Sequence, residues 1–238
     1  MIFKQFFDDA SSTYTYLLAD ENTLDAVIID PVSDRIAEYT SLLEELNLTL
    51  IAALDTHVHA DHVTALGLLG SKTNASTYLG TPGEVACADS ALEEGQVISF
   101  GTLSLNVMYT PGHTDDSYCF LLKQKDDAFM LFSGDTLLIG GTGRTDFQNG
   151  SASNLYDSLN QKILTLPENT IVYPGHDYHG NTQSTIGNEK VNNERVKIKD
   201  KALFIEFMNN LDLPDPKQMD VAVPANKSCG KIHSINEK

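Results

Sequence analysis

Residues 56–62 read THVHADH, so three histidines and one aspartate fall within a single short turn. The turn directly follows LIAAL at 50–54, whose apolar composition predicts a buried strand. Imidazole nitrogens and carboxylate oxygens are ligands for zinc, iron and manganese. The stretch therefore indicates a metal site at the end of a strand.

Three further groups of this kind occupy the same kind of position. His113 in TPGHT, Asp135 in SGD and His176 in YPGH each follow a predicted strand, and a glycine precedes each of them. A single histidine after a strand is usually an ordinary loop residue. Four strand ends that all carry metal-type ligands favour one shared site instead, and glycine lets the backbone turn sharply beside it.

Strand and helix patterns alternate along the chain, which predicts a mixed α and β domain without a flexible linker. The predicted strands begin at the N-terminus and continue at 13–19, 25–30, 50–54, 96–100, 103–109, 117–123, 128–134 and 170–176. One helix is predicted after a cap at Ser33, a short one near 65–69, and one over 201–211. A further helix is predicted through Leu155, Leu159 and Ile163, with Ser151 or Ser153 as its cap. The segment 214–238 is expected to be extended.

Composition excludes several classes of partner. A net charge of −17 argues against nucleic acid and anionic membranes, because both require clustered positive charge. No apolar run approaches the roughly 18–20 residues that span a bilayer. The N-terminus resembles neither a signal nor a transit peptide. Three cysteines (Cys87, Cys119 and Cys229) without a CxxC pair predict reduced thiols and a cytoplasmic location, or a mitochondrial matrix location if a eukaryotic transit peptide is missing.

The HxHxDH motif, followed by an isolated His, an isolated Asp and a final His, resembles the signature of the metallo-β-lactamase fold. The resemblance extends from the first strands to about His179. It implies an α+β fold, an αββα sandwich forming a single domain over residues 1–238, with its metal site along one edge of two sheets. The tail at 214–238 would then lie near the active site.

The superfamily motif leaves two metal arrangements open. In hydrolases such as glyoxalase II, two metals hold a hydroxide nucleophile between them. At the matching positions, His57, His59 and His113 would hold the first metal. Asp61, His62 and His176 would hold the second metal, and Asp135 would bridge the two.

A closer resemblance covers nearly the whole chain. GDTLLIGGTGRTDFQNGSASNLYDSL, YPGHDYHGNTQSTIGNE and LPDPKQMDVAVPANKSCG resemble the persulfide dioxygenases of this superfamily. Glyoxalase II enzymes have a histidine where Val58 stands, GHEYT in place of GHDYHG, and a longer helical C-terminal domain. Only about sixty residues follow His176 here. These departures disfavour the hydrolase.

The dioxygenase resemblance implies one Fe(II) per chain, held by His57, His113 and Asp135. Two imidazoles and one carboxylate leave positions open for a persulfide and dioxygen. The implied reaction oxidises glutathione persulfide with dioxygen and water to glutathione and sulfite, and a homodimer is implied as well. The remaining motif residues, His59, Asp61, His62 and His176, would support the ligands through hydrogen bonds or mark a vestigial second-metal site.

Substrate contacts are assigned on the same resemblance. Arg144 and Arg195 match positions near the glutathione pocket, and an arginine can pair bidentately with a carboxylate. Tyr178 is either a hydrogen-bond donor to the substrate or a half-buried packing residue. Cys229 would contact substrate or accept sulfane sulfur, or it is a plain buried thiol. Asp177 would anchor a loop or orient a ligand histidine.

Three hypotheses therefore follow: an iron persulfide dioxygenase, a two-metal thioester hydrolase, and a metal-stabilised or redox-sensing binding protein without turnover. Seven candidate ligands and an open site exceed the four ligands of an ordinary structural metal. Among the three, the dioxygenase is favoured.

Overall fold

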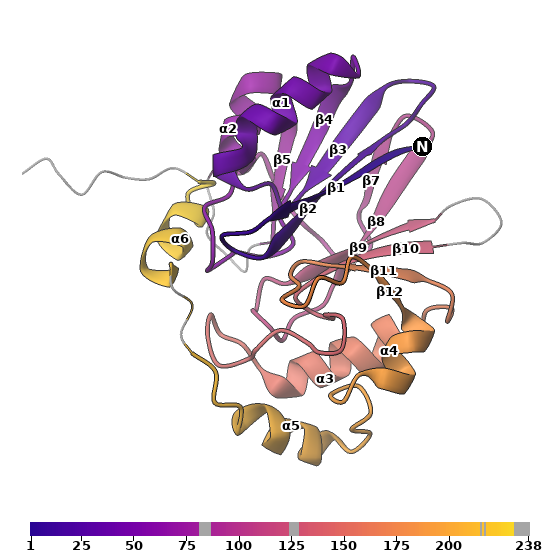
Figure 1. The fold of residues 1–238 in the computed structure, drawn as a ribbon, viewed down its shortest axis with the longest axis vertical. Coiled ribbons are helices and arrows are strands. Elements are labelled where there is room, and N and C mark those ends of the chain that lie inside the picture. The colour runs from indigo at the N-terminus through magenta and orange to yellow at the C-terminus, as the bar shows by residue number, and fades with distance from the viewer. Residues whose placement is uncertain (81–86, 124–128, 215, 217, 231–238) are drawn as a thin grey trace, which may run out of the picture. The chain divides into compact units, whose positions relative to one another are not determined.

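The computed structural model describes residues 1–80, 87–123, 129–214, 216 and 218–230. The chain forms two compact units (Figure 1), each built on one six-stranded sheet. The first unit comprises Met1–Ala91, Phe100–Thr102 and Pro214–Lys238, and the second comprises Leu92–Ser99 and Leu103–Leu213.

The sheet of the first unit carries the THVHADH turn. Its strands, in spatial order, are β1 (Ile2–Asp8), β2 (Thr13–Ala19), β3 (Asp25–Ile29), β4 (Thr49–Leu54), β5 (Ser76–Leu79) and β6 (Ser90–Ala91). β1, β2 and β3 pair antiparallel, whereas β3 to β6 pair parallel. β3 and β4 therefore end at the same edge, where Asp30, Asp55 and the histidine turn follow.

Two helices cover one face of this sheet. Tyr39 and Leu43 of α1 (Ile36–Glu45) and Leu66 of α2 (Leu66–Thr73) share one hydrophobic core with strand residues such as Ile28. The helix predicted after Ser33 is confirmed. The expected cap is wrong: Ser33 begins a 3₁₀ turn, Ser33–Arg35, and its side chain makes no capping bond. The backbone N–H of Ser33 instead donates to Val63, which fixes this turn from outside the helix.

The extended conformation predicted for 214–238 is wrong for residues 219–226, while residues 215, 217 and 231–238 lie outside the described part of the chain. Met219–Asn226 forms helix α6 with Pro224 inside it. The proline content favoured an extended chain, but burial of Ala222 and Ala225 stabilises the helix.

The sheet of the second unit carries the other three candidate ligands. Its strands, in spatial order, are β12 (Ser184–Thr185), β11 (Ile171–Pro174), β10 (Phe129–Gly134), β9 (Tyr118–Lys123), β8 (Leu103–Tyr109) and β7 (Val97–Phe100). β11 runs parallel to β10, and β9 runs antiparallel to both β10 and β8. β8, β10 and β11 therefore point the same way, and the loops after them meet at one edge.

Helices pack on this second sheet. Ser151 caps α3 (Ala152–Gln161) by accepting from the N–H of Asn154, which confirms one of the two expected caps. Leu155 and Leu159 of α3 share a core with α5 (Lys201–Asn209). Ile163 belongs to a separate 3₁₀ turn, Ile163–Thr165, in the same core.

Four short elements were not predicted: β5, β6, β12 and α4 (Ile186–Asn192). They span two to seven residues, which is too short for a clear periodic signal. The longer strands and α5 lie within one or two residues of their expected bounds. Within the described residues, no helix combines the length and apolarity needed to cross a membrane.

Candidate metal centre

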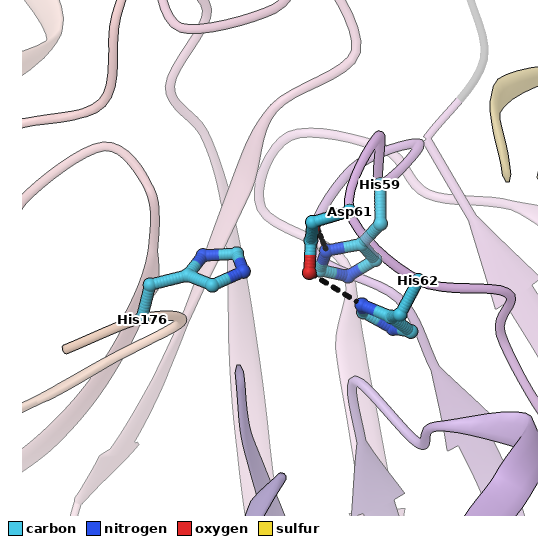
Figure 2. Close-up of side chains that lie close together, drawn as sticks. All are labelled: His59, Asp61, His62 and His176. Atoms are coloured by element: carbon cyan, nitrogen blue, oxygen red, sulfur yellow. Dashed lines mark hydrogen bonds and ion pairs between the residues drawn. The ribbon is translucent and has the colours of Figure 1, made fainter. Parts of the chain in front are cut away.

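The histidine turn is buried, although its residues are polar. His57, His59 and His62 are all buried, and Asp61 is partly exposed. Figure 2 shows Asp61 beside the rings of His59 and His62. Its Oδ2 lies 2.9 Å from Nδ1 of His62, and its Oδ1 lies 3.9 Å from Nδ1 of His59. Thr13 adds a hydrogen bond to the same Oδ2 at 2.8 Å.

Asp30, which the motif did not reveal, organises the start of the turn. Its Oδ1 accepts from the N–H of Thr56 at 2.7 Å, and its Oδ2 accepts from the Thr56 hydroxyl at 2.9 Å. Oγ1 of Thr56 in turn lies 3.0 Å from Nδ1 of His57. A hydroxyl that donates to Asp30 must accept from His57, so His57 carries its proton on Nδ1. Nε2 is then the nitrogen that can bind a metal.

The same carboxylate binds His59. Nε2 of His59 lies 3.1 Å from Oδ1 of Asp30. Burial disfavours the charged imidazole, but the carboxylates of Asp30, Asp61 and Asp55 outweigh this and raise the pKa of His59 to about 9. Asp30 has a φ of 52°, in the left-handed region that few non-glycine residues occupy. The only sequence signal for it is an acid at the end of an apolar strand, immediately before Pro31.

Asn226 of α6 also holds the turn in place. Its Nδ2 donates to the carbonyl oxygens of His59 at 2.9 Å and His62 at 2.8 Å. Its Oδ1 accepts from the N–H of Thr64 at 2.9 Å. The side chain is buried, so these three bonds replace its hydration. Sequence reasoning missed this residue because the contact spans more than 160 positions.

In the second unit, His113 and Asp135 form a pair of potential ligands. Nδ1 of His113 lies 2.7 Å from the carbonyl oxygen of Arg144 and donates to it, which leaves Nε2 as the metal-binding nitrogen. That Nε2 lies 3.5 Å from Oδ2 of Asp135. The arrangement fits a metal, because the two donor atoms face each other and a backbone acceptor fixes the imidazole tautomer.

His176 binds the other oxygen of the same carboxylate. Its Nδ1 lies 2.7 Å from Oδ1 of Asp135. The chain approaches closely here: a Cβ on Gly175 would lie 2.8 Å from Oδ1 of Asp135. The three ligand-type residues of this unit are thus together, as their strand ends predict. That His57 of the first unit shares one metal with His113 and Asp135 stays a prediction.

The two arginines assigned to substrate have protein partners. Arg144 pairs bidentately with Asp146 at 2.7 and 2.8 Å and lies over the ring of Phe147. Arg195 donates to the carbonyl oxygen of Thr142 at 2.7 Å, and burial lowers its pKa. Both therefore brace the loop that carries the Arg144 carbonyl. Their contact with substrate stays a prediction.

The residues after His176 differ in their surroundings. Asp177 accepts from the N–H groups of His179 and Asn181 at 2.8 and 2.7 Å. Burial would raise its pKa, but these bonds outweigh it and lower the pKa, so Asp177 anchors its loop as a carboxylate. Tyr178 is 67% exposed, which excludes the half-buried packing role. Its ring stacks parallel to that of His176, with centroids 6.2 Å apart.

The expectation of reduced thiols is wrong for two of the three cysteines. Cys229 forms a disulfide with Cys87, while Cys119 is buried and takes no part in a disulfide. Cys229 is therefore not a plain buried thiol. The partners lie 142 residues apart, so their spacing in the sequence carried no signal for the pairing.

Matches to known proteins cover most or nearly all of the chain. Residues 8–176 match the model of the metallo-beta-lactamase superfamily. The chain is 45% identical to the mouse protein named persulfide dioxygenase ETHE1, mitochondrial, over 97% of this chain and 89% of that protein. A hydroxyacylglutathione hydrolase of Francisella tularensis subsp. novicida is 39% identical over a smaller share, 73% of this chain and 66% of that protein.

Solved structures give the same result. The crystal structure of ETHE1 from Myxococcus xanthus matches with a TM-score of 0.92 and 50% identity, covering 97% of this chain and all of that one. The expected fold is thereby confirmed, with its two sheets in a mixed α+β architecture. The chain belongs to the metallo-β-lactamase superfamily and, within it, to the family of the persulfide dioxygenases.

Proposed function

We propose that the protein is an iron-dependent persulfide dioxygenase that converts glutathione persulfide, dioxygen and water to glutathione and sulfite. The reaction balances: the terminal sulfur of the persulfide leaves as sulfite with two oxygens from dioxygen and one from water. The other sulfur leaves as the thiol. The proposal follows the family, whose mouse and Myxococcus members cover nearly the whole chain.

One observation favours a single metal over the two-metal hydrolase. Oδ1 of Asp135 is bound to Nδ1 of His176, while Oδ2 faces Nε2 of His113. A carboxylate so engaged offers one oxygen to a metal and uses the other to hold its own orientation. Bridging two metals through both carboxylate oxygens would require His176 to release Oδ1.

The histidine turn supports the same conclusion. Asp61 and His62 bind each other at 2.9 Å, and Thr13 holds the same carboxylate oxygen. Nε2 of His59 is bound to Asp30. These groups are engaged with protein partners, which suits residues that support a ligand. We therefore assign His57, His113 and Asp135 as the ligands of one Fe(II).

The residues around the assigned ligands would each have a separate role. Thr56 and the Arg144 carbonyl hold His57 and His113 in the tautomer that presents Nε2. His176 orients Asp135 through Oδ1. Bound iron(II) would supply the redox chemistry with dioxygen that zinc, with its filled d shell, cannot. Arg144 would meet a carboxylate of glutathione, and exposed Tyr178 would contact the substrate.

The test compares two activities on one preparation. Protein reconstituted anaerobically with iron should hold about one iron per chain, as expected for two histidines and one carboxylate. It should consume oxygen with glutathione persulfide and release sulfite, and should leave a glutathione thioester intact. About two zinc per chain, with thioester hydrolysis and no oxygen uptake, would establish the hydrolase instead.

A further inference from the structure

The disulfide between Cys87 and Cys229 lies within the first unit and ties the C-terminal segment to it. Its Cα atoms are 5.7 Å apart, while 142 residues separate the two positions in the sequence. Cys119, in the second unit, is buried and not disulfide-bonded, and its sulfur contacts Thr110 and the carbonyl of Ser133. Among the described residues, the chain thus contains one disulfide and one buried thiol, Cys119, with which the disulfide can be compared.

The two sulfurs of the pair differ in access. Cys229 is 1% exposed and belongs to the core of the first unit. Cys87 is partly exposed at the margin of that core. Thiol–disulfide exchange requires a thiolate to reach one sulfur, and the other sulfur then leaves. Only Cys87 offers such access, so its sulfur is the one open to attack.

We propose that the Cys87–Cys229 disulfide is an exchange site for low-molecular-weight thiols such as glutathione. The thiolate attacks the Cys87 sulfur, a mixed disulfide forms on Cys87, and the electron pair of the broken S–S bond leaves on Cys229. A second thiol then releases the adduct as a disulfide and leaves Cys87 reduced. The two steps together oxidise two small thiols and reduce one protein disulfide.

Reduction of the disulfide affects the histidine turn through Asn226. Cys229 lies three residues after Asn226, whose side chain binds the backbone of His59, His62 and Thr64. The carbonyl of Cys229 also accepts from Gly67 at 3.0 Å. The φ of Cys229 is 55°, a left-handed conformation that is unfavourable for cysteine and that the disulfide helps to hold. Reduction therefore loosens the clamp that Asn226 places on the turn.

The first test locates the adduct. Full-length oxidised protein receives a short pulse of glutathione, is alkylated with N-ethylmaleimide, and is digested for mass spectrometry. The expected products are glutathione on Cys87, maleimide on Cys229 and no glutathione on Cys119. Glutathione on Cys229, or a cross-linked peptide that survives every glutathione concentration, would overturn the proposal. Cys119→Ser is the matched control and should give the same products at Cys87 and Cys229.

The second test measures the clamp by hydrogen exchange of backbone amides. In Cys87→Ser, peptides covering 57–67 should exchange about fivefold faster than in the oxidised protein, the factor for losing one ordinary hydrogen bond. Peptides from β10 in the second unit should be unchanged. Unchanged exchange at 57–67 would refute the coupling. Neither readout depends on bound metal or on turnover, so failure here is distinct from failure of the proposed activity.

Discussion

The backbone carbonyl of Arg144 lies 2.7 Å from Nδ1 of His113. The bond comes from the main chain, so its strength depends on where the loop runs and not on which side chain residue 144 carries. Gly143 controls that path. A Cβ there would lie 2.6 Å from the His113 ring and 2.5 Å from the Asp135 carbonyl.

Gly143→Ala should therefore lower metal affinity by about 10–100-fold, the range for lost support of a metal ligand. Gly141→Ala is the matched control, because a Cβ there meets nothing within 4 Å. Metal content after equal reconstitution and dialysis measures the difference. Equal iron in the two variants would show that the Arg144 carbonyl does not position His113.

The side chain of Arg144 is tested separately. Arg144→Ala keeps the carbonyl but removes the guanidinium and its bond to Asp146, so metal content should fall far less than in Gly143→Ala. The KM for glutathione persulfide should rise about tenfold, as for a lost hydrogen bond to a charged group. A small persulfide without carboxylates should show a smaller rise. Lys197→Ala, which removes an exposed lysine paired with Glu194, is the control. Equal rises for both substrates would mean that Arg144 only braces its loop through Asp146.

Sequence reasoning succeeded where chemistry and strand periodicity coincide in a few residues. LIAAL followed by THVHADH indicated both β4 and the ligand-rich turn. It failed where a contact joins distant segments. The Asn226 clamp and the Cys87–Cys229 bond depend on how the C-terminal segment folds back, and no local pattern encodes that. The carbonyl of Arg144 was missed for another reason: main-chain acceptors carry no residue signature.

The first unit should also lose stability in acid through Asp20. Hydrogen bonds from the side chain and backbone of Thr102, and from Asn22, hold the pKa of Asp20 well below its usual value. A depressed pKa stabilises the fold above the unfolded-state pKa of about 3.9, and that contribution is lost as the pH falls below it. Asp20→Asn should therefore lower Tm at pH 7, and the difference from the unmodified protein should shrink below about pH 4. Asp9→Asn, at an exposed turn, serves as the control. A Tm difference that does not vary with pH would exclude this contribution.

The two ends of THVHADH should respond differently to substitution. Thr56 presents Nε2 of His57, and we assign that atom to the metal, so His57→Ala removes one of three protein ligands. It should abolish iron binding and oxygen uptake.

His62 instead holds Asp61 at 2.9 Å. His62→Ala should retain substantial iron and lose activity about 10–100-fold, as expected for a supporting partner. Thr13→Val, which removes a further bond to Asp61, should produce a change in the same direction. A two-metal enzyme would behave otherwise: His62→Ala would release one of two bound metals and eliminate activity. Metal analysis and oxygen uptake on the three variants decide between the assignments, because only the single-iron site would keep its full metal content and part of its activity without His62.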